Sequence, residues 1–430
     1  MVQKKRTRLA ALSCSLFSFA CASADGTHDE RPTATEEAQT GAARDEADGY
    51  EPDDSTDPAL SNRPGLGQAY AAPVATASPY PVYTKAEVDA WSTSSAQYTR
   101  LASSWAGNVN RAYAAYPTQI SSVQRDVLKD ESVYIKTQAV LWAADGNPAR
   151  RAKVFALLDG LRGVTSWQTD SGEQYRLVCG WASTNLAQAA AIVGYQNADF
   201  KRFLTKVNYP IMDWTGANNW QASFADSKLA IAVYAKDAAL YADAKAYFYK
   251  RLPQSTYHSR YDGTHVVPLL DAKGVASPAV TIQAWGGYWG APQVKADYTF
   301  VNPSYVTDGF VTETIRDVGH VGMGLGAWMH AARTIRSHGD TLEKSAYDRI
   351  RAGYALHAKR VLVLKRTGTT PAPVPVKGMD GGDQAWFGAV KLFGTDTPAD
   401  VITMTKHPDV TGFAAAGANH LVAEAFADGN

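Results

Sequence analysis

Two polar stretches of this chain combine residue types that bind sugars and move protons. The first, at 213–221, carries two adjacent amides between two indoles: Trp214, Asn218, Asn219 and Trp220. Indole rings stack on the apolar faces of sugars, and side-chain amides donate hydrogen bonds to carboxylates. Two asparagines directly before a helix also cap it, so the stretch predicts either a sugar site or a helix cap.

The second stretch runs from Thr312 to His320 and contains four ionisable side chains. If it is helical, these lie at positions i, i+3, i+4 and i+7 and share one face: Glu313, Arg316, Asp317 and His320. Histidine has an ordinary pKa near ambient pH and is suited to proton transfer. A surface ladder of salt bridges is the alternative. The small residues that follow, at 322–332, favour a tightly packed setting instead.

A third polar stretch, at 252–263, follows a predicted helix. Its candidate residues are Tyr257, His258, Arg260 and Tyr261. A tyrosine hydroxyl can protonate a departing oxygen, or act as a base where an adjacent arginine lowers its pKa. A plain surface loop is the alternative.

None of these stretches has the spacing of a metal site. The acidic residues near His320 lack a second histidine at ligand spacing, since His330 falls on another part of the predicted helix. We therefore expect neither a metal nor another cofactor.

The overall charge excludes one class of partner. The 430 residues include 42 Lys+Arg and 42 Asp+Glu, so the formal net charge is zero. A nucleic-acid binder normally has a basic excess. A neutral total still allows a local basic cleft for an anionic glycan.

The first residues predict export. A basic start containing Lys4 and Arg8 precedes a short apolar stretch, Leu9 to Ala20, which is too short to span a bilayer. Residues 1–21 therefore form a predicted signal peptide. Cys21 follows a loose lipoprotein box, so lipidation at Cys21 and ordinary cleavage both stay open. We expect a secreted protein, extracellular or periplasmic, with a possible lipid anchor to the outer envelope. We also expect it to be a monomer.

The remaining cysteines do not form a disulfide framework. Cys14 lies within the signal, and Cys179 lies in an apolar helical run where a buried thiol is expected. The domain must therefore be stabilised by its core. Residues 22–76 are rich in Asp, Glu, Ala and Pro and almost lack large apolar side chains, which predicts a disordered acidic tether.

From residue 77 to 430 the sequence predicts one all-α domain. Apolar residues recur at helical spacing in runs separated by Gly, Pro or Asn. The runs are Val88–Trp105, Ser132–Ala144, Ala149–Leu161, Gln174–Val193, Phe200–Val207, Gln221–Val233, Ala238–Leu252, Thr312–Ser337 and Thr341–Val363. Antiparallel helical hairpins joined by short loops favour an (α/α) toroid or incomplete barrel, with a long irregular insertion at Val266–Val306 lining or covering a cleft.

At these motifs the chain resembles a known family. The pattern E-T-x-R-D-x-G-H before a Gly/Ala-rich helix, and N-N-W opening a helix about a hundred residues earlier, resemble bacterial alginate-lyase superfamily proteins. The lead-in Ser304-Tyr305, with Asp308-Gly309, extends the resemblance, which covers about Gln174 to Phe393. Related lyases often have Asn-Asn-His where this chain has Trp220, so a base at that position is not carried over.

The resemblance implies a polysaccharide lyase that cleaves a uronate-containing glycan, such as alginate or glucuronan, by β-elimination. The expected catalytic residues are Asn219 and Arg316 on the substrate carboxylate, His320 as base, and Tyr257 or Tyr261 as acid or base. The expected substrate-binding residues are Trp214, Asn218, Trp220, His258, Arg260, Tyr305, Glu313 and Asp317.

Two other functions stay open. A toroidal glycoside hydrolase needs two carboxylates flanking the scissile bond, and Glu313 and Asp317 lie one turn apart on one predicted helix. Asp262 or Asp308 could supply a partner. A non-catalytic glycan-binding lipoprotein would use its tryptophans as stacking platforms.

Overall fold

The computed structural model describes the following residues: 69–70, 77–113, 115–169, 173–213, 218–262, 308–311, 314, 318–367, 385–406 and 424–427. All of them belong to one unit, Ser55–Asn430. Among these residues, no helix has the length and apolar character needed to cross a bilayer. The predicted signal peptide and the insertion at Val266–Val306 lie outside the described residues.

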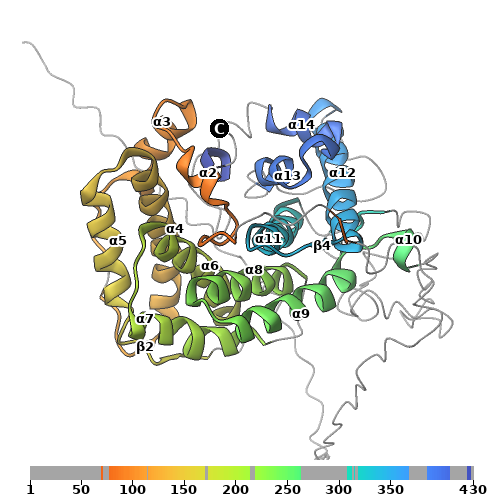
Figure 1. Ribbon diagram of the computed structural model, residues 1–430. Coiled ribbons are helices and arrows are strands. Elements are labelled where there is room, and N and C mark those ends of the chain that lie inside the picture. Colours follow the sequence, from red (N-terminus) through yellow and green to blue (C-terminus); the bar gives the residue numbers. More distant parts are fainter. Residues whose placement is uncertain are drawn as a thin grey trace, which may run out of the picture. The chain divides into compact units, whose positions relative to one another are not determined.

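Helices make up most of the described chain (Figure 1). The α-helices are α2 (Lys85–Asp89), α3 (Ala96–Ser103), α4 (Ser122–Asp145), α5 (Pro148–Gly160), α6 (Gln174–Val193), α7 (Ala198–Arg202), α8 (Asn218–Ala235), α9 (Ala238–Ser255), α10 (Ser259–Asp262), α11 (Val318–Ser337), α12 (Lys344–Thr367), α13 (Ala385–Phe393), α14 (Ala399–Thr405) and α16 (Glu424–Ala427). Shorter helical turns are η1 (Trp105–Gly107), η2 (Phe203–Asn208), η3 (Tyr209–Met212) and η7 (Gly394–Asp396).

Two small ladders join distant parts of the chain. β1 (Ala69–Tyr70) pairs antiparallel with β4 (Leu342–Glu343), and β2 (Gln119–Ile120) pairs parallel with β3 (Ser166–Trp167). β1 lies within the predicted tether. Ala69–Tyr70 of that segment therefore pairs with β4, which lies between α11 and α12.

Local signals in the sequence set the ends of the helices. Ser121 and Gln124 form a capping box at the start of α4, in which each side chain accepts a hydrogen bond from the other residue's backbone N–H. Asn147 caps α5, and Pro148 takes its first position. Gly146 ends α4 at φ +66°, a left-handed conformation that glycine adopts at low cost.

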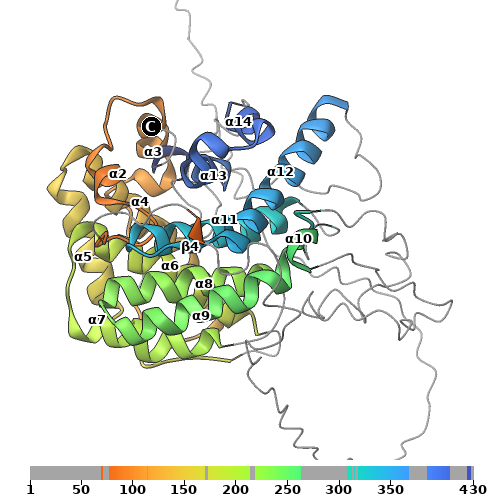
Figure 2. The same ribbon diagram turned by 45° about the vertical axis from the view of Figure 1, so that its right-hand side comes forward.

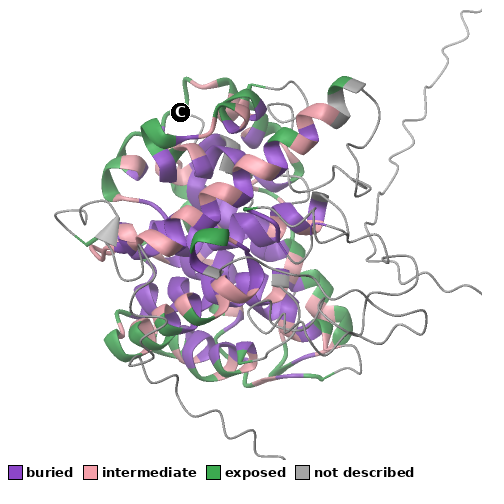
Figure 3. Cartoon of the chain, turned by 90° about the vertical axis from the view of Figure 1, so that its right-hand side faces the viewer, coloured by how far each residue is buried: buried purple, intermediate pink, exposed green. Residues whose placement is uncertain are grey.

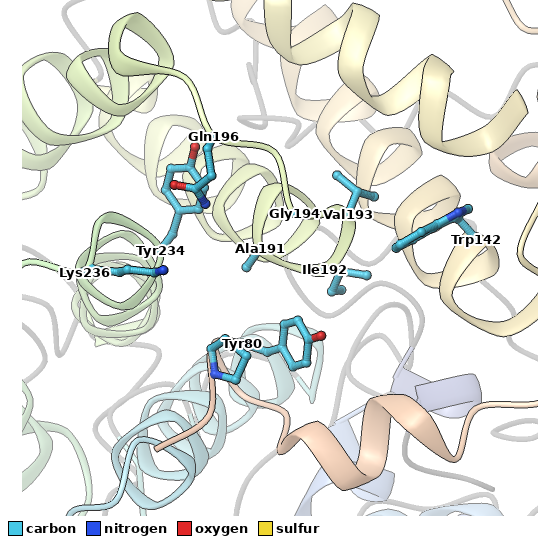
Figure 4. A pocket seen from close by; sticks show the side chains of 10 residues that line it. Tyr80, Trp142, Ala191, Ile192, Val193, Gly194, Gln196, Tyr234 and Lys236 are labelled. Atoms are coloured by element: carbon cyan, nitrogen blue, oxygen red, sulfur yellow. The ribbon is translucent and has the colours of Figure 1, made fainter. Parts of the chain in front are cut away.

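Four long helices pack side by side in the order α4, α6, α8, α11. The C-terminal turns of the first three line one pocket, through Trp142, Val193 and Tyr234, with Tyr80 lying across them (Figure 4). The end of α11 lies nearby, because Ser78 N–H donates to the Ser337 carbonyl at 2.7 Å. The four helices are therefore parallel, with their C-terminal ends at one mouth and their N-terminal ends at the other.

Three of these inner helices, α4, α8 and α11, pack against the next long helix in the chain. α5 follows α4 after a two-residue turn, and α9 follows α8 after Lys236–Asp237; Figures 1 and 2 both show α8 and α9 side by side. α12 packs on α11, α13 and α14. The prediction of an all-α domain of antiparallel helical hairpins is confirmed. α13 follows α11 in the inner row, and α16 packs on both α13 and α3, which in turn contacts α4.

The core lies between the inner helices and their outer partners, where buried residues gather (Figure 3). Close approach depends on glycine at two places. A Cβ on Gly180 would lie 3.0 Å from the ring of Phe224, and a Cβ on Gly353 would lie 2.6 Å from Leu325. These contacts join α6 to α8 and α12 to α11.

Three predicted helices differ from the observed ones. The run Val88–Trp105 is broken into α2 and α3, because Ser95 caps a new helix. α4 begins at Ser122, ten residues before the predicted start. The predicted helix Thr312–Ser337 begins only at Val318, and Thr314 lies in a turn that its N–H closes on the Val311 carbonyl at 2.8 Å.

Candidate functional site

Asn219 lies in the first turn of α8 and is 2 % exposed. Its backbone carbonyl accepts a hydrogen bond from Ser223 Oγ at 2.6 Å. Ser223 Oγ in turn accepts a hydrogen bond from Trp181 Nε1 at 3.1 Å. The start of α8 is thereby held on α6. The Oδ1 atom of Asn219 is buried without a hydrogen-bond partner among the described residues. The amide therefore has unused bonding capacity, which is uncommon for a buried polar group.

His320 lies in the first turn of α11 and is half-buried. Because α8 and α11 are parallel, their first turns lie at the same mouth. A fully buried pair fixes the alignment of the two helices: His330 Nδ1 is 3.3 Å from Asp226 Oδ2. Asn219 precedes Asp226 by about two helical turns, and His320 precedes His330 by about three. Both candidates therefore lie beyond this pair on the same side.

The segment after α9 is tied to the segment that leads into α11. Thr256 forms a β-bridge with Val311. The Tyr257 N–H donates to the Phe310 carbonyl at 2.9 Å, and its carbonyl accepts from Gly309 N–H at the same distance. Tyr257 is 4 % exposed. The structure thus brings Tyr257 to the mouth where α11 begins, although about fifty residues separate it from Gly309 in sequence.

The motif around Thr314 is held by α12. Thr314 Oγ1 accepts from Val311 N–H at 2.8 Å and lies 3.1 Å from His357 Nε2. Burial, with a smaller effect of Arg360, lowers the pKa of His357 well below its ordinary value. The ring is therefore neutral, and its Nε2 forms a hydrogen bond with the Thr314 hydroxyl. Arg360 reaches the Thr314 carbonyl at 3.5 Å.

The pKa of Tyr261 is raised, whereas an adjacent arginine was expected to lower it. Its hydroxyl donates to Asp348, which also binds Lys344 at 2.6 Å. Arg260 and Arg349 lie over the ring, at 5.8 and 5.5 Å from its centroid. Burial and the Asp348 carboxylate outweigh them and raise the pKa of Tyr261. Its hydroxyl is engaged in holding α12, and Tyr261 is not suited to act as a base.

His258 and Arg260 lie beside this cluster. His258 Nδ1 accepts from Arg260 N–H at 3.3 Å and is 3.8 Å from Asp308 Oδ2. The other oxygen of Asp308 accepts from Ser259 N–H at 2.6 Å. His258 is half-buried and Arg260 exposed, so both lie at the surface of this mouth.

Several predicted site residues lie outside the described residues: Trp214, Tyr305, Glu313, Arg316 and Asp317, together with the side chain of Asn218. Trp220 is half-buried in the first turn of α8, next to Asn219. The shared helical face predicted for the second stretch involves Glu313, Arg316 and Asp317 and so lies outside the described residues. Within the described residues, no group of three or more His, Cys, Asp or Glu could hold a metal ion.

Sequence reasoning missed His357 and the Asp226–His330 pair. His357 is 3 % exposed, and both members of the pair are fully buried. In both cases the partner lies in a distant segment: Asp226 is on α8, and the partner of His357, Thr314, lies in the turn before α11. At the candidate mouth the N-terminal ends of α6, α8 and α11 also contribute positive potential, which favours an anionic ligand.

Comparisons with known proteins give one structural similarity. No family model matches the chain, and no curated protein matches its sequence. The chain is similar in structure to alginate lyase A1-III from Sphingomonas species A1, with 12 % identity and a TM-score of 0.43 over 75 % of this chain and 91 % of that one. Identity and TM-score are both too low to transfer an activity or a residue role.

Proposed function

We propose that this protein is a polysaccharide lyase that cleaves a uronate-containing glycan by β-elimination without a metal ion. The observation that supports the proposal is the gathering of different chemical groups at one mouth. Asn219 on α8 supplies a buried side-chain amide, His320 on α11 supplies an imidazole, and Tyr257 after α9 supplies a phenol. These are the groups that β-elimination needs, and they come from three separate elements.

The reaction removes the C5 proton of a uronate and expels the sugar linked through O4. The ionised carboxylate makes that proton weakly acidic, so hydrogen-bond donors must stabilise the charge that develops toward the enolate. In this proposal the side-chain N–H groups of Asn219 and Arg316 donate hydrogen bonds to the carboxylate. His320 takes the C5 proton, and Tyr257 gives a proton to the leaving oxygen. Trp220 and Trp214 stack on the sugar rings.

A glycoside hydrolase is supported less well. It requires two carboxyl groups about 5 to 10 Å apart on either side of the scissile bond. Of the carboxylates described near this mouth, Asp348 binds Tyr261 and Lys344, and Asp308 binds the Ser259 N–H. Both are engaged in holding local structure. The described residues therefore favour elimination over hydrolysis.

The test is a panel of uronate polymers, including alginate and glucuronan, assayed in two ways. Ultraviolet absorbance detects the unsaturated uronate that only a lyase produces, and a reducing-end assay detects any chain cleavage. We expect both signals to rise together on at least one polymer. Reducing ends without absorbance would identify a hydrolase, and neither signal on any polymer would favour a binding protein.

Export and assembly remain predictions of the sequence. We propose a secreted monomer, either cleaved after the signal peptide or lipidated at Cys21. Mass spectrometry of the mature N-terminus distinguishes these two forms.

A further inference from the structure

The flank formed by α4 and α5 carries the only exposed aromatic side chains in the described part of the chain. Trp105 is 40 % exposed and Tyr113 is 42 % exposed. Other described aromatic residues are buried or half-buried. Exposed indole and phenol rings offer large, rigid, apolar surfaces on which sugar rings can stack.

Each of these rings is accompanied by a cation. The guanidinium of Arg111 lies over the Trp105 ring, 4.5 Å from its centroid, and Lys153 Nζ lies 5.2 Å from the centroid of Tyr113. Lys153 also donates to the Arg111 carbonyl at 3.1 Å. The four residues therefore form one continuous surface, which we call the flank platform.

Among the described residues, the two cations of the flank platform contact aromatic rings rather than carboxylates. Neither Arg111 nor Lys153 forms an ion pair with a carboxylate of the described residues, whereas the neighbouring Arg150 binds Asp145 at 2.8 Å. Two unpaired cations beside two exposed rings complement a ligand that is both anionic and built from sugar rings.

The platform is also held in place by buried hydrogen bonds. Gln138 on α4 donates to the Ala106 carbonyl at 2.6 Å, and Arg150 on α5 donates to the Gly107 carbonyl at 2.8 Å. The hydroxyl of Tyr134 donates to the Asn108 carbonyl at 3.0 Å. The segment that carries both rings is thus fixed on two helices, so little ordering entropy opposes binding.

We infer that the flank platform is a second binding site for an anionic polysaccharide, separate from the candidate catalytic mouth. The mouth lies at the N-terminal turns of α8 and α11, whereas the platform lies on α4 and α5, beyond α6. The choice of a polyuronate as the ligand rests on the proposed function. A site of this kind holds the polymer near the enzyme without contacting the bond that is cleaved.

The test compares binding with turnover. Binding is measured by retardation of the full-length protein in native gels that contain polymannuronate, with neutral dextran as the reference. The variant His320→Ala serves as background so that the polymer is not consumed. In that background we expect Trp105→Ala/Tyr113→Ala to raise the apparent Kd by roughly tenfold or more, because stacking residues dominate such sites. We also expect salt to weaken the wild-type retardation.

Two controls separate this inference from the proposed function. Ile402→Ala removes another exposed apolar side chain, on α14, and should leave retardation unchanged. With His320 restored, Trp105→Ala/Tyr113→Ala should slow cleavage of long polymer and leave turnover of a short oligouronate unaltered.

The inference is overturned if the double variant binds polymannuronate as tightly as its parent, or if the parent is not retarded at all. If polymannuronate retards the parent but not the double variant, the flank platform is supported even when no polymer is cleaved. In that case only the lyase proposal fails. Unchanged thermal unfolding of the double variant verifies that it is folded.

Discussion

The imidazole of His357 lies against the hydroxyl of Thr314, with 3.1 Å between Nε2 and Oγ1. Thr314 is the second residue of the motif that contains Glu313, Arg316 and His320. Its hydroxyl also accepts the Val311 N–H, so one side chain links α12 to the turn that precedes α11. We therefore expect His357 to act as a positioning residue through Thr314.

Replacing His357 with Ala should lower kcat by roughly 10- to 100-fold with little change in KM, because a small displacement of reacting groups costs rate more than binding. His357→Gln, whose amide can still form a hydrogen bond with the Thr314 hydroxyl, should recover part of the loss. Steady-state kinetics on the best polyuronate measure both effects. If the folded fraction of His357→Ala falls enough to account for all the lost activity, His357 contributes only to packing.

His357 should also make stability depend on pH. Its pKa in the folded protein is well below the value of 6.5 expected in the unfolded chain. As pH falls below about 6.5, the unfolded chain gains a proton that the folded protein does not, so the free energy of unfolding decreases. Urea unfolding at pH 7.5 and pH 5.5 should show a smaller decrease for His357→Gln than for wild type. Equal decreases would show that His357 does not contribute.

Two nearby tyrosines should respond differently to loss of the hydroxyl. Tyr261→Phe removes the hydrogen bond to Asp348 and should cost about 1 to 3 kcal/mol of stability, with kcat of the folded enzyme nearly unchanged. Tyr257→Phe should lower kcat, because Tyr257 is the proposed acid. The two variants are matched controls for each other in denaturation and rate measurements. Loss of kcat in Tyr261→Phe and not in Tyr257→Phe would exchange their roles.

The N-terminal boundary of the domain can be tested by two deletions. Removing residues 22–68 should leave the melting temperature within a few degrees of wild type, because that composition offers little apolar surface. Removing residues 22–76 also deletes β1 and its pairing with β4. This deletion should lower the free energy of unfolding by roughly 1 kcal/mol for each hydrogen bond lost. Differential scanning calorimetry distinguishes the two. A large loss in the shorter deletion would mean that the tether packs on the domain.

The parts of the fold with clear periodicity and clear ends were predictable. The predicted run Gln174–Val193 coincides with α6, which Gly194 ends in a left-handed conformation. The first ten residues of α4 were missed because most of them are polar, and two of their three apolar side chains, Val123 and Val127, are exposed. Their capping box at Ser121 was the available signal.

The candidate site was less predictable, because its geometry depends on contacts between distant segments. Asn219 and His320 are predicted from residue type and motif alone. Pairing of Tyr257 with Gly309 and Phe310 could not be foreseen, since neither segment has a strand pattern. Burial and the carboxylate of Asp348, nearly ninety residues away, raise the pKa of Tyr261 and outweigh the effect of the arginine next to it in sequence.

The central claim is that Asn219 and His320 act on one transition state at the shared mouth of α8 and α11. The most direct test is kcat on the best uronate polymer for His320→Ala and Asn219→Ala, with His338→Ala, just past the opposite end of α11, as the matched control. We expect losses of about 10²–10⁴-fold for His320→Ala and about 10²–10³-fold for Asn219→Ala, with normal unfolding curves and no loss in the control. Near-normal turnover in His320→Ala, or a loss of activity that follows the folded fraction, would contradict the claim.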